Sequence, residues 1–477
     1  MPEILYFVLL CGWVVVLAWN FKKAVIILPA FFPLYLLKFQ VGFVPFNVIE
    51  VMVYLTAFWM FGLFLYKRFS KENNSLLGKI KRVFLGDGKI LKDVKKSFFR
   101  LVMPAGALVL GALGGLYLAY LYGDLMPALG IFKGWVLMPI LYGIIVVRNL
   151  RTPEDRRRTL YFYMLSCLVL SFWALYQVIL RDYITIDQRA SGPFESANYL
   201  ALYIAPAFVL ACVSLWQKME IFFFGEIEVE GLVKNLWKKF VGLFKKEKIV
   251  ETVRLPVAYE VIVFGATGLA LVAAKSYGGL LGVLGALFLY TIYELFFSDF
   301  KEKYGSIWKK ATVFVVIIFM AVTAVIAQIG TTKFDDFLAF ERQSSSSVRM
   351  QTWTVALKLV EENPFLGVGL GRFQSVYEER ASEILGQAPY EKTMLHPHNL
   401  LLSTWMNSGL IGVIALVWLI VAVFWTLKDK KLTYENRRFF AVVLAMFIVV
   451  CLHGIIDQQF WKNDLALLWW LLVGLVI

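Results

Sequence analysis

Long apolar runs constrain this chain more than any other feature. Several of them reach the ~20 residues that an α-helix needs to cross the hydrocarbon core of a bilayer. With 60% hydrophobic residues in 477, the chain has too little polar surface to cover a water-soluble globule. The sequence therefore predicts an all-α polytopic integral membrane protein, with residues 1–477 forming a single membrane domain.

The apolar segments predict about 12–13 transmembrane helices. They fall at residues 4–19, 24–37, 48–66, 101–122, 131–147, 159–180, 198–216, 256–273, 278–297, 310–328, 398–425, 439–456 and 464–477. The first segment lacks a basic flank before it and a small-residue cleavage site after it, so we expect a retained helix. The 4 cysteines all lie inside apolar runs, which indicates buried thiols and no disulfide framework.

The formal net charge of +14 is unevenly distributed. When the connections are assigned alternately to two sides, most of the 48 Lys and Arg residues fall on one side, which the positive-inside rule assigns to the cytoplasm. Positive charge here indicates topology and contact with membrane lipids, and no nucleic-acid partner is expected. Two cytoplasmic loops, 67–100 and 217–255, alternate lysine and apolar residues at helical spacing. They predict amphipathic helices on the membrane surface, and a partner-binding role is the alternative.

The longest external connection spans residues 329–397. A run of four serines within it predicts the start of a helix that continues to about residue 362, where Asn363 and Pro364 end it. Arg349 falls in the first turn of this helix, and Trp353 falls one turn later.

The topology gathers basic residues at the external interface. They are Arg189, Lys275, Arg349 and His398. Guanidinium groups stay charged and bind phosphate oxygens in pairs, so this set predicts a site for an anionic lipid headgroup such as a diphosphate. The simpler alternative is that each arginine pairs with an acidic residue of its own loop.

Two of the 3 histidines, His396 and His398, immediately precede a long apolar run. This position predicts a reactive side chain at the mouth of a helix, or else a histidine that donates to a loop carbonyl. A His-x-His pair can chelate a metal, but no third ligand is spaced nearby and no metal is expected. His453 and Asp457 are four residues apart at the outer end of a later segment, and they would share a helix face if that helix continues so far.

Several motifs accompany these residues. His398 and Asn399 are followed, after nine residues, by Gly409 and Gly412. Upstream, Arg349 and Trp353 form an Arg-x3-Trp pattern before a Pro-Phe-Leu-Gly-Val-Gly stretch. Further upstream, Arg189 precedes a Gly-Pro-Phe sequence and Asn198. Together they resemble the O-antigen ligase and O-antigen polymerase superfamily of bacterial envelope enzymes, and the ligase signature in particular.

The resemblance implies a GT-C-like glycosyltransferase that uses no cofactor. Its members move a finished glycan from undecaprenyl diphosphate to an acceptor hydroxyl, usually on a lipid A core sugar, with inversion and without metal. It further implies that Arg189 and Arg349 hold the donor diphosphate, and that His398 takes the acceptor proton. The catalytic loop would be 329–397, on the periplasmic face of the bacterial inner membrane.

One position departs from the family pattern. Family members commonly carry Ser-Arg-Gly between the eighth and ninth segments, whereas this chain has Tyr277 in place of the arginine. We expect Lys275 to contribute a point charge to the diphosphate site instead. The residues expected to support the site are Asn399, Trp353, Gly409, Gly412, His396, His453, Asp457 and Tyr277.

The motifs leave the acceptor open. A polymerase that extends a lipid-linked glycan and a protein O-oligosaccharyltransferase are alternatives within the superfamily. A lipid-linked oligosaccharide flippase is an alternative of another class, for which inverted repeats and charged residues near the bilayer midplane are typical.

Overall fold

A computed structural model describes residues 2–42, 44–69, 98–185, 188–224, 257–296, 345–429 and 434–477. These residues are almost entirely helical, and 8 of their helices are long and apolar enough to cross a membrane. Three shorter apolar helices accompany them, at Ile4–Trp19, Val257–Ala273 and Asn463–Val476. The predicted all-α polytopic class is thus confirmed. The predicted span 310–328 and most of the two basic loops lie outside the described residues.

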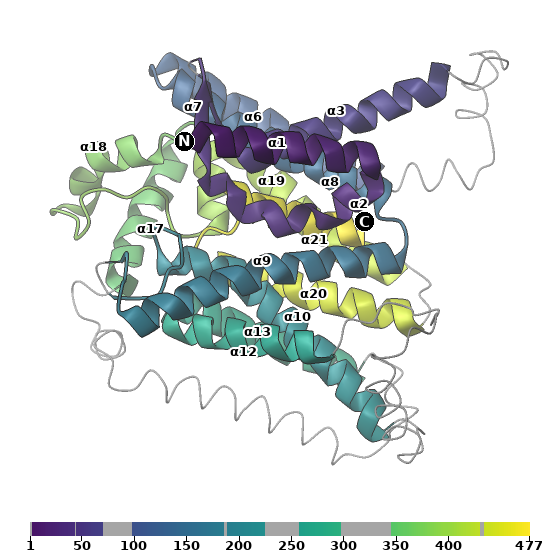
Figure 1. The fold of residues 1–477 in the computed structure, drawn as a ribbon. Coiled ribbons are helices and arrows are strands. Elements are labelled where there is room, and N and C mark those ends of the chain that lie inside the picture. The colour runs from purple at the N-terminus through teal and green to yellow at the C-terminus, as the bar shows by residue number, and fades with distance from the viewer. Residues whose placement is uncertain are drawn as a thin grey trace, which may run out of the picture.

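The described elements follow one another along the chain as helices with one short hairpin (Figure 1). They are α1 (Pro2–Trp19), α2 (Phe21–Ile27), η1 (Leu28–Leu36), β1 (Lys38–Val41), β2 (Val44–Asn47), α3 (Val48–Phe69), η2 (Phe98–Val102), α6 (Met103–Leu121), α7 (Leu125–Ile131), η3 (Phe132–Leu137), α8 (Met138–Asn149), α9 (Pro153–Leu180), α10 (Ala197–Phe224), α12 (Val257–Ala273), α13 (Tyr277–Phe296), α17 (Ser345–Glu362), α18 (Phe373–Leu385), α19 (Leu400–Asp429), α20 (Tyr434–Gly454) and α21 (Asn463–Val476).

The predicted segment 24–37 is not one α-helix. It forms α2 and then the 3₁₀ helix η1, which contains Pro29 and Pro33. A proline has no backbone N–H and breaks the α-helical hydrogen-bond pattern. The irregular segment packs against α3, α9 and α21, so that protein rather than lipid surrounds much of it. The antiparallel pair β1 and β2 then leads into α3.

Helices α10 and α21 form the centre of the bundle. α10 packs against α9, α12, α13 and α20, while α21 packs against α8 and α20. Every residue of α21 from Asp464 to Val476 is buried, including Trp469 and Trp470. This helix is apolar on all sides because none of its faces meets lipid.

The segment 345–397 between α13 and α19 has a small hydrophobic core of its own. α17 begins in the serine run and ends beside Asn363, as predicted. It packs against α18, and its buried residues Val355, Ala356 and Leu359 share a cluster with Met406 of α19. Helices α17 and α18 are therefore attached to the beginning of α19, directly after the predicted histidine motif.

Candidate active site

The candidate site lies where the chain before α19 meets the chain after α20. We call residues 395–399 the histidine loop. Asn399 caps α19, since its Oδ1 accepts the Leu402 N–H at 2.9 Å. Its Nδ2 donates to the Ile455 carbonyl at 2.7 Å, and Trp353 of α17 donates to the Pro397 carbonyl at 2.8 Å. Three elements thus hold the histidine loop in place.

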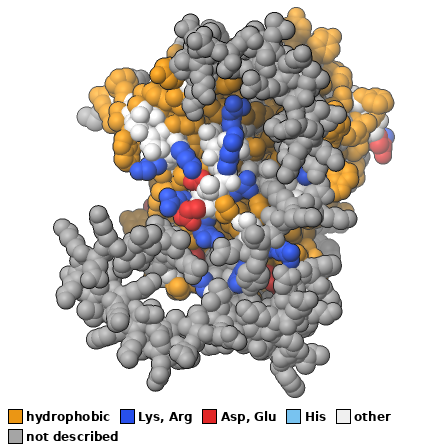
Figure 2. Space-filling model, turned by 90° about the vertical axis from the view of Figure 1, so that its right-hand side faces the viewer, with side chains coloured by type: hydrophobic (Ala, Val, Ile, Leu, Met, Phe, Trp, Pro, Cys, Tyr) orange, Lys and Arg blue, Asp and Glu red, His pale blue; other side chains and the backbone are white. Residues whose placement is uncertain are grey.

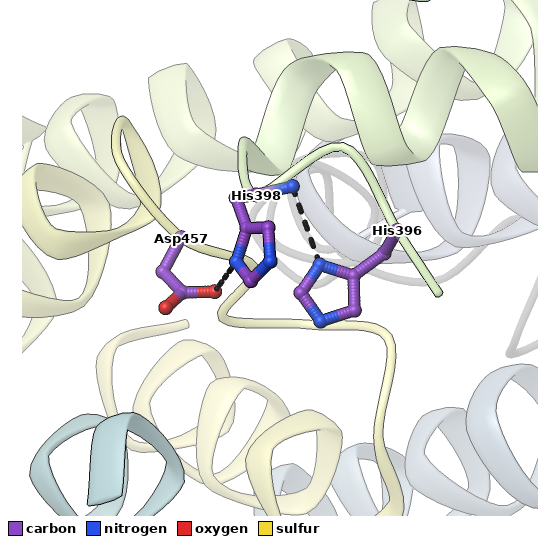
Figure 3. Close-up of side chains that lie close together, drawn as sticks. All are labelled: His396, His398 and Asp457. Carbon is purple, nitrogen blue, oxygen red and sulfur yellow. Dashed lines mark hydrogen bonds and ion pairs between the residues drawn. The ribbon is translucent and has the colours of Figure 1, made fainter. Parts of the chain in front are cut away.

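His398 and Asp457 form a hydrogen-bonded pair, which we call the dyad (Figure 3). The Nδ1 atom of His398 lies 3.1 Å from Oδ1 of Asp457. α20 ends at Gly454, so His453 and Asp457 do not share a helix face. Instead, the Asp457 N–H donates to the His453 carbonyl at 3.0 Å in a turn, and this turn directs the carboxylate toward the histidine loop.

The dyad has the electrostatics of a general base. Burial alone would raise the pKa of the Asp457 carboxyl, but the charge and hydrogen bond of His398, with the charges of His396 and Arg349, hold it well below its usual range. An ionised carboxylate accepts the Nδ1–H of His398, which leaves the lone pair of a neutral ring on Nε2. Within the described part of the chain, no side chain or backbone group hydrogen-bonds this Nε2. The side chain of His398 is 25% exposed and that of Asp457 is 3% exposed, so only the imidazole is open to a substrate.

His396 supports the backbone of His398. Its Nδ1 accepts the His398 N–H at 3.2 Å, and its Nε2 lies 3.2 Å from the hydroxyl of Tyr199 on α10. Burial, the neighbouring His398 and the charges of Arg349 and Lys462 lower the pKa of His396 to about 3, against the opposite effect of Asp457. His396 is therefore neutral at physiological pH. His398 has a φ of +50°, a left-handed conformation that costs a non-glycine residue about 1–2 kcal/mol.

Arg349 lies beside the dyad. Its charge acts on His396, His453 and Asp457, and it precedes Trp353 by one turn of α17. The Nε atom of Arg349 is buried, and no described residue accepts a hydrogen bond from it. A buried guanidinium N–H without a partner is costly, which suits it to an anionic ligand.

Arg189 lies beside the turn that carries Lys275, at the same end of the bundle. Arg189 is buried, and its Nε donates to the Ala274 carbonyl at 2.7 Å, directly before Lys275. Its guanidinium also donates to Asn198 at 2.8 Å, and the next residue, Tyr199, contacts His396. The predicted basic residues are thus connected to the histidine loop through the first turn of α10.

His453 lies against the first turn of α13, which begins at Tyr277. Gly278 follows Tyr277, and a Cβ atom placed on it would lie 2.9 Å from the His453 ring. The imidazole of His453 is buried against this glycine-rich turn. The structure therefore assigns His453 to packing between α20 and α13, beside the dyad but not in it.

The two motif glycines have a structural role. Gly409 interrupts α19 with a φ of +62°, and the carbonyl of Phe365 enters the break to accept the Leu410 N–H at 3.1 Å. A Cβ atom on Gly409 would lie 2.0 Å from that carbonyl oxygen. Gly412 lies against Gly111 of α6, where a Cβ atom on Gly111 would lie 2.8 Å from the Gly412 nitrogen. The glycines thus permit backbone contact, and they position the histidine loop only indirectly.

The histidine pair and Asp457 also have the composition of a metal site. One ligand atom from each of His396, His398 and Asp457 lies within 4.8 Å of the others. However, both ring nitrogens of His396 and Nδ1 of His398 already contact protein groups. A metal would have to displace the hydrogen bonds that hold the loop, so the arrangement fits proton transfer better than ligation.

Comparison with known proteins shows a similarity over part of the chain. Residues 262–417 match the family model described as O-antigen ligase. Over this third of its length the chain is similar to the O-antigen ligase family. The match includes the histidine loop, Arg349, Trp353 and both motif glycines, whereas Arg189 and Asp457 lie outside it.

Two curated relatives have segments similar to this chain. A putative polysaccharide ligase of Rickettsia conorii is 28% identical over 135 residues, which is 28% of this chain and 30% of that protein. The O-antigen ligase of Salmonella typhimurium is 29% identical over 164 residues, which is 33% of this chain and 40% of that protein. The chain thus matches less than half the length of either relative.

Sequence reasoning missed two side chains of the site and understated a third. Asp457 was expected only as a supporting residue, yet it is the partner of His398. Tyr199 and Lys462 were not predicted, and the Lys462 Nζ lies 3.9 Å from the centroid of the Tyr199 ring. Tyr199 follows the motif asparagine directly, and Lys462 is an ionisable residue between two apolar helices, so position in the sequence could have drawn attention to both.

Proposed function

We propose that this protein is an O-antigen ligase-like glycosyltransferase. It transfers a glycan from undecaprenyl diphosphate to the hydroxyl of an acceptor, a sugar of the lipid A core. The observation that carries this proposal is the hydrogen-bonded His398–Asp457 pair, whose neighbour Arg349 has a buried Nε that no described residue accepts a hydrogen bond from. A base and an anion-binding group in one place are the two components that transfer from a lipid diphosphate requires.

The dyad acts on the acceptor. Nε2 of His398 removes the proton of the acceptor hydroxyl while its oxygen forms a bond to the anomeric carbon of the donor. The ring then carries the proton as an imidazolium, and the ionised carboxylate of Asp457 stabilises that charge. Attack from the side opposite the leaving group inverts the anomeric centre.

The arginines act on the donor. As the bond between the anomeric carbon and the diphosphate oxygen breaks, the electron pair leaves with undecaprenyl diphosphate, whose negative charge increases. Arg349, together with Arg189 and Lys275, supplies positive charge where this increase occurs. Arg189 is held by two hydrogen bonds, so little reorganisation is needed when the donor binds.

We assign the reaction to the extracytoplasmic face of the inner membrane. Lys and Arg side chains gather at the right-hand end of the bundle in Figure 1, which Figure 2 views directly. The positive-inside rule assigns that end to the cytoplasm. α17 and α18, which adjoin the histidine loop, lie at the opposite end.

The test is transfer by the purified protein in EDTA. The donor is an undecaprenyl-diphosphate-linked glycan and the acceptor is a truncated lipid A core; His398→Ala and Arg349→Ala are compared with wild type. Lys358→Ala is the matched control, because Lys358 lies on the same helix as Arg349 with its side chain 51% exposed. We expect transfer by wild type and the control, and its loss in the other two variants.

Other products would assign the protein elsewhere. Longer glycans on the lipid carrier without an acceptor would indicate a polymerase, and glycan on added protein would indicate an oligosaccharyltransferase. Donor that crosses a liposome membrane without transfer would contradict the proposed class of reaction.

A further inference from the structure

We infer that His396 is a positioning residue, which as a neutral imidazole protonated on Nε2 holds the backbone of His398 in its left-handed conformation. The inference rests on the proposed function for its kinetic consequence, but its structural content can be tested without any activity. It concerns a histidine that neither removes the acceptor proton nor binds the donor.

The hydrogen bonds of the histidine loop determine which nitrogen of His396 carries the proton. A backbone N–H can only donate, so the Nδ1 atom that lies 3.2 Å from the His398 nitrogen must be an acceptor. A neutral imidazole has one N–H, which is then on Nε2 and donates to the Tyr199 hydroxyl oxygen at 3.2 Å. A doubly protonated ring would have no acceptor left for the His398 N–H.

The surroundings of His396 oppose its protonation. The ring is 9% exposed and lies close to His398, with ring centroids 4.2 Å apart. Besides His398, the charged groups that act on it are Arg349, Lys462 and Asp457, and only Asp457 favours the protonated form. Lys462 is fixed nearby by the aromatic rings of Tyr35, Phe194 and Tyr199.

The bond from the His398 N–H has a direct geometric consequence. A φ of +50° is unfavourable for histidine, so the surrounding structure must stabilise it. The hydrogen bond to His396 stabilises this φ, and in this conformation the His398 ring lies against Asp457 (Figure 3). Without it, His398 is expected to relax toward negative φ and to move Nε2 away from the acceptor.

Two isosteric variants separate positioning from packing. In His396→Asn the side-chain oxygen lies near the position of Nδ1 and can accept the His398 N–H, whereas in His396→Gln the polar end lies near the position of Nε2. We expect His396→Ala and His396→Gln to lower kcat about 100-fold, because a displacement of a catalytic group by about 1 Å costs that much. We expect His396→Asn to retain most of the wild-type kcat. The KM for the donor should change little in all three.

Equal or better activity in His396→Gln than in His396→Asn would overturn the inference, as would wild-type kcat in His396→Ala. Thermal unfolding of each variant in detergent identifies any that fails to fold. The Asn and Gln variants both keep a polar side chain at a buried position, so a general packing role would not rank them in this order.

Selective labelling provides a readout that does not depend on activity. The chain contains 3 histidines, so nitrogen-15 histidine yields three pairs of ring signals, and His396→Asn identifies the pair from His396. We expect a bare Nδ1 and a protonated Nε2 on His396 from pH 7 down to pH 5. A protonated Nδ1 on His396 would refute the inference even if transfer is observed, and the expected tautomer would support it even if transfer is not.

Discussion

The Nδ1 atom of His398 lies 3.1 Å from the carboxylate of Asp457, which is 59 residues further along the chain. The two residues belong to different segments, one before α19 and one after α20. Their contact fixes the tautomer of His398 and leaves a lone pair on its Nε2. It also places the negative charge of Asp457 beside the ring. Much of the chemistry assigned to this protein depends on this single contact.

Asp457→Asn is expected to lower kcat at least about 100-fold, because the amide cannot stabilise the imidazolium and no longer selects the tautomer with a bare Nε2. Steady-state transfer assays would measure this loss. Asp124→Asn is the matched control, since Asp124 forms an ion pair with Arg372 and its side chain is 45% exposed. If the two residues act as one unit, Asp457→Asn with His398→Ala should be no slower than His398→Ala alone.

Arg349→Ala is expected to lower kcat/KM about 100-fold, and Arg349→Lys is expected to recover only part of it, because a lysine is a point charge and cannot bind phosphate oxygens in pairs. Competition by free undecaprenyl diphosphate would report the same change as weaker product inhibition. Unchanged inhibition in Arg349→Ala would remove this residue from the diphosphate site.

Gly409→Ala is expected to lower the free energy of unfolding by more than about 1 kcal/mol, through both a strained φ and a clash with the Phe365 carbonyl. Gly386→Ala is the matched control. Gly386 has a similar φ of +66°, but no atom lies within 4 Å of an added Cβ. Thermal unfolding in detergent should show the larger shift for Gly409→Ala, and equal shifts would mean that α19 tolerates the added methyl group.

Stability is expected to fall as the pH drops below about 6.5. The pKa of His396 is lowered from 6.5 to about 3 on folding, so the folded protein binds fewer protons than the unfolded chain between these values. The contribution of the neutral His396 to the free energy of unfolding is complete above pH 6.5. Below that pH, the free energy of unfolding falls by up to about 1.4 kcal/mol per pH unit. The unfolding temperature of His396→Asn should depend less steeply on pH between 6 and 4 than that of wild type. Parallel curves would contradict the low pKa.

Transfer is expected to proceed at the same rate in EDTA, because both ring nitrogens of His396 and the Nδ1 atom of His398 are engaged in hydrogen bonds to protein. Activity that disappears in EDTA and returns with a divalent cation would instead make His396, His398 and Asp457 metal ligands. Asp124→Asn, assayed in parallel, would show whether any effect of chelation is local to the site.

Several features of the fold followed from sequence because they depend on local chemistry. Apolar runs of bilayer length predicted the spanning helices, and the serine run and Asn363–Pro364 predicted the ends of α17. The replacement of an α-helix by α2 and η1 was harder to predict, since Pro29 and Pro33 are tolerated there only because neighbouring helices enclose the segment.

The sequence by itself determined the class of protein and the residues capable of the chemistry, because hydropathy, charge asymmetry and motif spacing are properties of the chain alone. It indicated His398, Arg349 and Arg189 without any knowledge of their neighbours. Only the tertiary structure decided that Asp457 rather than another acid contacts His398, and that Nδ1 of His396 accepts the backbone N–H of His398. Those contacts depend on where α20 ends and on how α17 and α10 hold the histidine loop, and such contacts between distant segments form only when the helices pack.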